Sequence, residues 1–497
     1  FFFKQKTAYE IPKHDWSSDV CSSDLPRRHP EGATAGNLQL HDPSRRSRHH
    51  VDAALSVHPR PVEARTTGMR ISRITRLGIV GLLISLSSLT VVGNPAPWPQ
   101  WRGPSRDGRV EGPEWPRRLG EAEVRRAWRV PLGPGYSGPI VSERAVFVTE
   151  THEKKTEVVR ALDRRTGEEL WKHDWVGSIS VPFYAKSRGD WIRATPAFDG
   201  ETLFVAGMRD VLVALDASSG KERWRIDFVR KYGTSVPDFG LVCSPLPDGD
   251  SVYLQAANSV VRIRKSDGEV LWRSFEGRSG VMSEGCFSSP VIATIRGERQ
   301  LVVQSREKLA GLALADGRVL WSQPVPSFRG MNILTPTVVG DSVFTSSYQN
   351  KGWLYEVTRE GDTWGVRERW ASTAQGYMSS PVVIGGHAYL HLANNRFTCV
   401  DLATGERPWT SDAFGKYVSL VVQGNRILGL DERGVLLLIE ADPKEFRLVG
   451  QHKVAESEAW AHLAISGDEV FVRELKAMSV FRWTEGAVDR VASAGAP

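Results

Sequence analysis

A strand, a glycine turn and a tryptophan recur along most of this chain, and this repeat constrains the fold more than any other feature. One half of the repeat is an apolar run followed by a glycine turn and tryptophan, as in VLVALDASSGKERW, which ends at Trp224. Repeats of this length are typical of propellers and solenoids. Successive tryptophans of the pattern lie 39 to 53 residues apart. Its members, which we expect to dock neighbouring units together, are Trp128, Trp171, Trp224, Trp272, Trp321, Trp370 and Trp409.

The other half of the repeat is a short strand, a glycine turn and a second strand, as in ATPAFDGETLFV, and it occurs eight times. Each complete unit is therefore predicted to be a four-stranded antiparallel meander. Such a unit cannot bury both of its faces alone, whereas radial stacking protects nearly every sheet edge. The sequence predicts an all-β fold, an eight-bladed β-propeller over residues 127–486. We expect an N-terminal strand around Trp128 to pair with the last blade and close the ring.

The turn between the third and fourth strands has a physical rationale in this scheme. Glycine supplies a turn residue with positive φ, and an aspartate four residues earlier accepts hydrogen bonds from the turn backbone. The tryptophan four residues after the glycine offers a large flat surface to the neighbouring blade. The glycines are Gly167, Gly220, Gly268, Gly317 and Gly405, and the aspartates are Asp163, Asp216 and Asp401.

Five segments lie outside the propeller. Residues 1–25 contain DWSSDVCSSDL, which resembles the translation of a sequencing adapter, and we interpret them as an artefact. Residues 26–68 lack apolar periodicity and are predicted to be disordered or translated upstream sequence. Residues 69–93 place arginines before a short apolar run, which predicts a signal peptide, with an uncleaved anchor as the alternative. We expect residues 94–126 to be an irregular leader packed across the propeller surface, or else a docking segment, and residues 487–497 to be a disordered tail.

The predicted export determines the expected cellular location and limits the classes of binding partner. A signal peptide predicts a periplasmic or secreted protein, which we expect to be monomeric and without a membrane span after cleavage. The formal charge is +6, from 64 basic and 58 acidic residues, but 13 of the basic and 8 of the acidic residues precede residue 94. The remainder is nearly neutral, so we expect no nucleic-acid partner. Cys243, Cys286 and Cys399 lack the spacing of metal ligands. We expect them to be buried free thiols, with a disulfide between Cys243 and Cys286 as the alternative.

The pattern ALDxxTGxxxW resembles the tryptophan-docking repeats of the PQQ-like propeller superfamily, from Ala127 to Trp483. The leader NPAPWPQWRGPSRDG further resembles secreted BamB-like bacterial proteins, in which the propeller is a non-catalytic scaffold. This resemblance implies a binding or assembly scaffold that needs no cofactor and binds an envelope protein or a small polar or aromatic ligand. The signal-like segment has no cysteine near its end, so we do not expect the lipid anchor of BamB.

Two alternatives remain open at this point. The superfamily also contains quinoprotein alcohol and sugar dehydrogenases, which bind PQQ and Ca²⁺ and commonly carry a vicinal cysteine pair. This chain has no adjacent cysteines, and no catalytic aspartate can be aligned, so we favour a protein without catalytic activity. Carbohydrate binding by the propeller is the third possibility.

The segments just before the innermost strands converge at one mouth of the channel and hold the candidate ligand-binding residues. A ring of aromatic and charged side chains suits a flat or polar ligand. The alternative is that these groups cap the channel and satisfy one another around ordered water. Asp190, Glu284 and Asn332 carry oxygen ligands that Ca²⁺ prefers, and His462 is a possible base, but we predict no metal site and no catalytic residue. The full set is Tyr136, Asp190, Trp191, Arg193, Phe239, Glu284, Met331, Asn332, Tyr377, Tyr417, Trp460 and His462.

Overall fold

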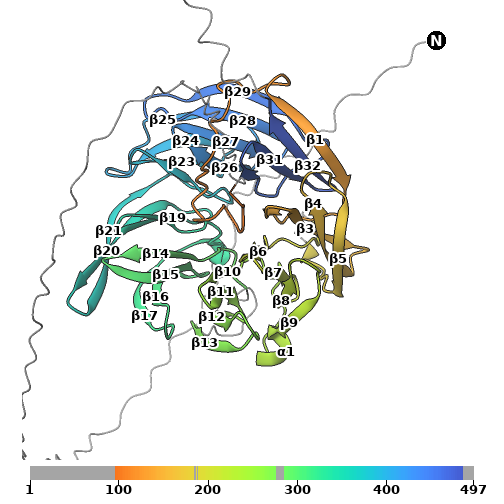
Figure 1. Cartoon of the computed structure of the whole chain (residues 1–497). Helices are drawn as coiled ribbons and strands as arrows, with labels where there is room; N and C mark the ends of the chain where they lie inside the picture. The colour runs from red at the N-terminus through yellow and green to blue at the C-terminus, as the bar shows by residue number, and fades with distance from the viewer. Residues whose placement is uncertain (1–95, 184–185, 187–188, 276–284, 485–497) are drawn as a thin grey trace, which may run out of the picture. The chain divides into compact units, whose positions relative to one another are not determined.

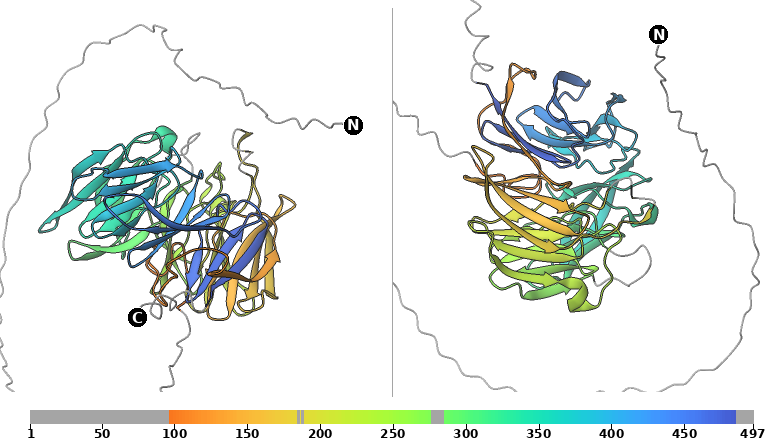
Figure 2. Two further views of the ribbon diagram at one scale, coloured as in Figure 1. Left: turned by 90° about the horizontal axis from the view of Figure 1, so that it is seen from above. Right: turned by 90° about the vertical axis from the view of Figure 1, so that its right-hand side faces the viewer.

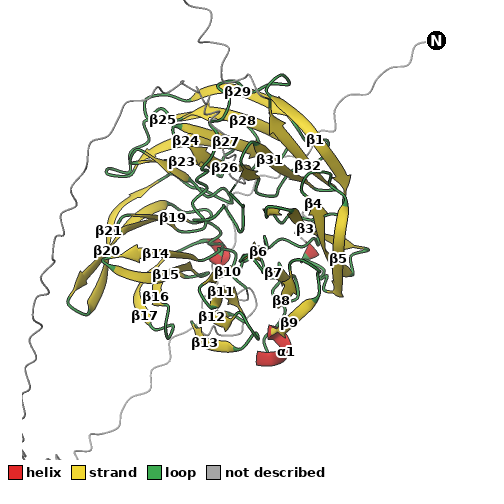
Figure 3. Ribbon diagram, viewed as in Figure 1, coloured by secondary structure: helices red, strands yellow, loops and turns green. Residues whose placement is uncertain are grey.

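The computed structural model describes residues 96–183, 186, 189–275 and 285–484. These residues form eight four-stranded sheets arranged around a common axis (Figures 1 and 3). Figure 2 shows the same ring from two further directions. The eight-bladed propeller predicted from the repeat is confirmed. The described helices are short, α1 (Phe228–Tyr232) and η2 (Phe328–Gly330), and no helix among these residues is long and apolar enough to cross a membrane.

The first four blades follow the chain in order, each from its innermost to its outermost strand. Blade 1 consists of β2 (Ile140–Val141), β3 (Ala145–His152), β4 (Thr156–Asp163) and β5 (Glu169–Val176). Blade 2 consists of β6 (Ala197–Phe198), β7 (Thr202–Gly207), β8 (Val211–Asp216) and β9 (Glu222–Asp227). Blade 3 consists of β10 (Leu246–Asp248), β11 (Ser251–Ala256), β12 (Ser259–Arg264) and β13 (Val270–Ser274). Blade 4 consists of β14 (Val291–Ile295), β15 (Glu298–Gln304), β16 (Lys308–Ala313) and β17 (Val319–Pro324).

The last four blades repeat this order, except that the outermost strand of blade 8 comes from the N-terminal side. Blade 5 consists of β18 (Thr337–Val339), β19 (Ser342–Ser346), β20 (Gly352–Glu360) and β21 (Thr363–Ser372). Blade 6 consists of β22 (Val382–Ile384), β23 (His387–His391), β24 (Arg396–Asp401) and β25 (Trp409–Ala413). Blade 7 consists of β26 (Val418–Gln423), β27 (Arg426–Asp431), β28 (Val435–Glu440) and β29 (Arg447–Lys453). Blade 8 consists of β30 (Ala464–Ser466), β31 (Glu469–Glu474), β32 (Ala477–Trp483) and β1 (Val124–Pro131).

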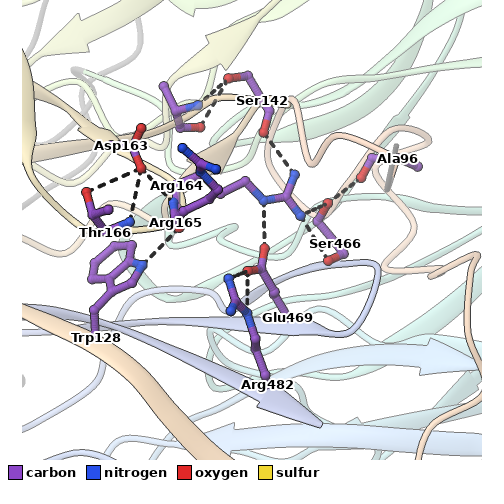
Figure 4. Close-up of polar contacts among 11 residues, drawn as sticks. Ala96, Trp128, Ser142, Asp163, Arg164, Arg165, Thr166, Ser466, Glu469 and Arg482 are labelled. Atoms are coloured by element: carbon purple, nitrogen blue, oxygen red, sulfur yellow. Dashed lines mark hydrogen bonds and ion pairs between the residues drawn. The ribbon is translucent and has the colours of Figure 1, made fainter. Parts of the chain in front are cut away.

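The ring closes where β1 pairs with β32. The pairing is antiparallel, and Trp128 lies opposite Val480. A buried cluster ties blade 8 to blade 1 beside this pairing (Figure 4). The Nε of Arg164 in blade 1 donates to the carboxylate of Glu469 in blade 8 at 2.6 Å. The Nη2 of Arg164 donates to the hydroxyl of Ser466 at 2.9 Å. The predicted closure is thus present and is reinforced by an ion pair between the first and last blades.

Most of the repeated tryptophans dock neighbouring blades through one hydrogen bond. Six of the seven donate their indole N–H to a backbone carbonyl of the next blade, over 2.7–3.1 Å. In five of the six, Trp409 being the exception, the ring also lies on the turn glycine of that blade. A Cβ at Gly268, which has a φ of 76°, would lie 2.8 Å from Trp224. Asp163, Asp216 and Asp401 accept hydrogen bonds from the turn backbone, as predicted. The six donors are Trp128, Trp171, Trp224, Trp272, Trp370 and Trp409.

Trp321 is the exception among the seven. Its indole donates to the side-chain oxygen of Gln300 in its own blade, at 2.6 Å. The next blade has no glycine turn at the corresponding place, because β20 and β21 continue as a long hairpin to Glu360 and Thr363. Trp321 still packs in a core shared with Tyr355 of that blade. Packing between blades is therefore kept where the docking hydrogen bond is lost.

Candidate functional site at the propeller axis

Aromatic side chains occupy the end of the propeller at which each innermost strand begins, and we call this set the aromatic rim. Most of its members are partly exposed, whereas Tyr417 is buried with 6% exposure. Phe287 and Tyr348 belong to the rim but were not among the residues expected from the sequence. The rim consists of Tyr136, Trp191, Phe239, Phe287, Tyr348, Tyr377, Tyr417 and Trp460.

The rim residues meet as pairs from adjacent blades. Tyr417 stacks on Trp460 with ring centroids 5.9 Å apart. The ring centroids of Tyr377 and Tyr348 lie 4.7 Å apart. The guanidinium carbon of Arg193 lies 5.4 Å from the ring centre of Tyr136. Each pair spans two blades, which is the spacing that the repeat imposes.

Phe239 completes the set of contacts along the rim. Its ring centroid lies 5.7 Å from that of Phe287, and the guanidinium of Arg306 lies over Phe287 at 5.2 Å. Aromatic faces next to guanidinium groups therefore line this end of the ring, with one cation–π pair between blades 1 and 2 and another within blade 4.

The polar residues of the predicted site are held by the backbone. Asp190 accepts a hydrogen bond from the N–H of Val181 at 2.8 Å. Asn332 is 1% exposed, and its side-chain nitrogen donates to the carbonyls of Arg306 and Val325, each at 3.0 Å. Both side chains fix loops that precede innermost strands. Glu284 lies outside the described residues.

His462 lies below the rim and contacts the leader. Its Nδ1 lies 2.8 Å from the carbonyl oxygen of Leu463, and its ring packs edge-on against Trp101 at 4.9 Å. Burial, followed by the charge of Arg102, lowers the pKa of His462 to about 3. The imidazole is therefore neutral over the ordinary pH range and serves the packing of the axis.

Serine and threonine hydroxyls join neighbouring blades just below the rim, and they were not among the residues expected from the sequence. Thr195 accepts from the N–H of Gly138 at 2.9 Å, and its own N–H donates to the hydroxyl of Ser244 at 3.1 Å. The N–H of Ser244 continues the pattern to Ser289 at 3.0 Å. A signal was present in the sequence, because ATP, CSP, LTP and two copies of SSP stand directly before five of the innermost strands. These hydroxyls satisfy backbone donors that proline-containing segments leave without a strand partner.

The leader, residues 96–123, fills the axis at the end opposite the rim. We expected it to lie across the propeller surface, but its first part enters the ring beside β26 (Figure 1). Trp98, 3% exposed, exchanges two backbone hydrogen bonds of 2.9 Å with Val141 of blade 1. The carbonyl of Pro99 accepts from Phe198 of blade 2 at 2.7 Å. The reason is that the innermost strands present free backbone edges to the axis, and the leader provides partners for them.

The same segment also forms hydrogen bonds with blades 5, 7 and 8. Residues 108 and 110 bond to Val422 of blade 7, each at 2.8 Å. The indole of Trp101 donates to the hydroxyl of Thr335, directly before blade 5, at 3.1 Å. The hydroxyl of Ser466 in blade 8 donates to the carbonyl of Ala96 at 2.6 Å. Because Arg102 reaches blade 6 and Arg106 reaches blades 3 and 4, residues 96–110 contact every blade.

Two buried arginines of the leader complete these contacts. Arg102 donates to the carbonyls of Asp107, at 3.0 Å, and of Pro381, directly before blade 6. Arg106 donates to the carbonyl of Pro290, before blade 4, at 2.8 Å and to that of Ser244, before blade 3, at 3.2 Å. Burial lowers the pKa of Arg102 to about 10 and that of Arg106 to about 9. Carbonyl dipoles thus solvate two guanidinium groups at the axis.

The described oxygen-bearing residues of the predicted site do not come together as one group. Asp190 and Asn332 stand before blades 2 and 5, which are not neighbours, and each is engaged by backbone groups. In the part of the chain that the structure describes, no group of three or more His, Cys, Asp or Glu side chains could hold a metal ion. Cys243, Cys286 and Cys399 are free thiols.

Comparisons with known proteins agree with this description. The family model described as outer membrane protein assembly factor BamB matches residues 154–411. BamB of Yersinia pestis is 25% identical over 282 residues, which cover 54% of this chain and 66% of that protein. BamB of Moranella endobia is 24% identical over 348 residues, which cover 67% of this chain and 82% of that protein.

Among solved structures, BamB from Moraxella catarrhalis superposes with a TM-score of 0.52 at 13% identity, covering 73% of this chain and 98% of that chain. At this identity the likeness concerns the fold alone. The family model, by contrast, matches more than half of the sequence and includes the repeats from blade 1 to blade 6. This chain therefore belongs to the family of the outer membrane protein assembly factor BamB.

Proposed function

We propose that this protein is a non-catalytic scaffold of the cell envelope, periplasmic or secreted, which binds a protein partner as a monomer. The observation that carries the proposal is the occupied axis: residues 96–110 bond to every blade and fill one end of the channel. Membership in a family described as outer membrane protein assembly factors supports the same role.

The aromatic rim is the surface that we assign to the partner. Protein interfaces are enriched in aromatic residues and arginine, which bury large areas at low entropic cost. The rim combines both, and the loops beside it expose Phe183, at 83%, and Phe328, at 45%. Burial of this exposed apolar surface by a partner would stabilise the complex by about 25 cal/mol per Å².

Site-specific photocrosslinking tests the assignment. A photoreactive residue in place of Trp191 or Phe328 should crosslink to one envelope protein in intact cells. The control is Leu448 on the outermost strand β29, which is also exposed, at 42%, and should give no adduct. Crosslinks at Leu448 alone, or adducts that do not differ between the positions, would contradict the rim as the binding surface.

A second assay separates the scaffold from the dehydrogenase alternative. The purified protein is mixed with PQQ and Ca²⁺, and reduction of an artificial dye is followed with a panel of alcohols and aldoses. We expect no turnover, because Asp190 and Asn332 hold backbone groups of separate blades. Dye reduction that depends on PQQ would overturn the proposal.

A further inference from the structure

A cavity of about 290 Å³ lies where the leader passes the inner strands of blades 3 and 4. The leader contributes Gln100 and residues 104–106, and the blades contribute the ends of β10 and β14 with the start of β15. The strands place this cavity at the end of the axis opposite the aromatic rim, because the rim precedes the same strands.

The cavity exists because the leader's backbone leaves the sheet edges there. Backbone hydrogen bonds hold the leader to Val141 of blade 1, Phe198 of blade 2 and Val422 of blade 7. Within the described chain, its hydrogen bonds to blades 3 and 4 come from the side chain of Arg106. The space between that side chain and the two blades stays open.

The charge at the cavity is unbalanced. Arg106 is 2% exposed and bonds to the side-chain oxygen of Gln100, at 3.0 Å, and to backbone carbonyls, but no described carboxylate forms an ion pair with it. Arg299 of blade 4, which also lines the cavity, forms a two-pronged ion pair with Asp248, at 2.6 and 3.0 Å. The lining thus carries two guanidinium groups and one carboxylate. A buried charge without a counter-charge is costly, which agrees with the lowered pKa of Arg106.

We propose that this cavity is a binding site for a small carboxylate ligand, held between Arg106 and Arg299. A carboxylate balances the excess positive charge, and guanidinium groups bind carboxylates through paired, charge-assisted hydrogen bonds. Ser105, Thr294 and Gln100 add polar groups to the lining. The volume is near the lower end of the range for small-molecule pockets, which favours a ligand of a few carbon atoms.

Titration calorimetry with defined probes tests the site in the folded protein. Succinate represents a free carboxylate, and succinamide is its neutral counterpart. The tripeptide Gly-Gly-Ala with a free C-terminus, compared with its C-terminal amide, represents the carboxylate at the end of a peptide chain. We expect succinate to bind with a Kd in the millimolar range or tighter and succinamide not to bind. Binding by the tripeptide acid in place of succinate would identify a peptide end as the source of the carboxylate.

Two substitutions on the cavity wall should change the affinity in opposite directions. Asp248→Asn removes the competing carboxylate and should tighten binding about tenfold, whereas Arg299→Gln should weaken it about tenfold. Ser105→Trp fills the cavity from the leader side and should abolish binding. Arg318→Gln is the matched control, because Arg318 is an exposed arginine of blade 4 outside the cavity.

The outcome distinguishes the site from general electrostatics. Asp248 and Arg299 are both partly exposed, at 28% and 53% of their side chains, so their substitution should leave the thermal midpoint nearly unchanged. If both acids fail to bind the unmodified protein at about 10 mM, the site does not exist in the form proposed. Equal effects of Arg299→Gln and Arg318→Gln would also overturn it. Either result leaves the assignment of the rim untouched, because that assignment rests on crosslinking.

Discussion

The guanidinium of Arg164 in blade 1 and the carboxylate of Glu469 in blade 8 form an ion pair of 2.6 Å, with side-chain exposures of 5% and 6%. Arg482 binds the other carboxylate oxygen at 2.8 Å, and the carbonyl of Arg164 accepts the indole N–H of Trp128 at 2.9 Å. The junction between the first and last blades therefore rests on a connected polar cluster together with the pairing of β1 and β32.

Glu469→Gln should destabilise the ring strongly. It leaves the guanidinium of Arg164 buried without a counter-charge, which typically costs about 3–5 kcal/mol. Asp316→Asn is the control, because its partner Arg318 lies 3.6 Å away with both side chains largely exposed, and exposed pairs contribute below about 1 kcal/mol. Thermal and denaturant unfolding measure both variants. Similar small losses in the two variants would show that the buried pair does not hold the closure.

Trp224→Phe should destabilise the contact between blades 2 and 3. The substitution removes the hydrogen bond to the carbonyl of Lys265, at 2.7 Å, and keeps an aromatic ring on Gly268. Loss of one such bond costs about 1–2 kcal/mol. Trp364→Phe on the partly exposed hairpin of blade 5 is the control, and the thermal midpoint is the measurement. A Trp224→Phe variant as stable as this control would contradict a docking role for the indole N–H.

The sequence predicted the blades because their determinants are local and periodic. A glycine turn and a tryptophan four residues later occur together in Gly220 and Trp224, and each repetition of the pattern marks one blade. The hairpin between β20 and β21 breaks the pattern, yet the first two strands of this unit still predict a blade. Trp321 could not be foreseen as an exception, because its hydrogen-bond partner depends on the length of the next hairpin.

The axis could be predicted only in part. The rim follows from the repeat, since each innermost strand begins at the same end of the ring. The leader has no periodicity, and its partners, such as Val422 for Val110, lie hundreds of residues away. Isolated backbone bridges of this kind leave no signal in a single sequence. The arginines of RGPSR were visible, but their partners are backbone carbonyls, which sequence patterns do not mark.

Stability should depend on pH through Asp210 between blades 2 and 3. Its side chain is 1% exposed and accepts a hydrogen bond from the N–H of Ala257 at 2.9 Å. Burial raises its pKa to about 7. Because the folded pKa lies above the unfolded value of about 3.9, stability falls as pH rises from about 4 to about 7, by roughly 4 kcal/mol.

Asp210→Asn should reduce this dependence by the share of Asp210, because the amide oxygen can keep the bond to Ala257 without becoming charged. Glu157, whose pKa burial also raises to about 7, keeps its own share. The thermal midpoints of the two proteins should be similar near pH 4, and the variant should be the more stable one at pH 8. Asp362→Asn, at a fully exposed position, controls for the loss of a carboxylate. An unchanged pH profile in Asp210→Asn would show that another group carries the effect.

Arg102→Lys should destabilise the axis although it keeps the positive charge. The planar guanidinium reaches the carbonyls of Asp107 and Pro381 from one side chain, and a compact ammonium group cannot match that fork. Carbonyls left without a donor in a buried site cost about 1–3 kcal/mol. Arg109→Lys is the matched control, because Arg109 is exposed and donates to the carbonyl of Val383 at 2.8 Å.

Hydrogen exchange gives the more specific readout: the amides of Val110 and Val422 should exchange faster in Arg102→Lys alone, because opening of the leader frees both. Unchanged protection at these two amides would show that the leader is held by its backbone bonds and not by the buried arginine.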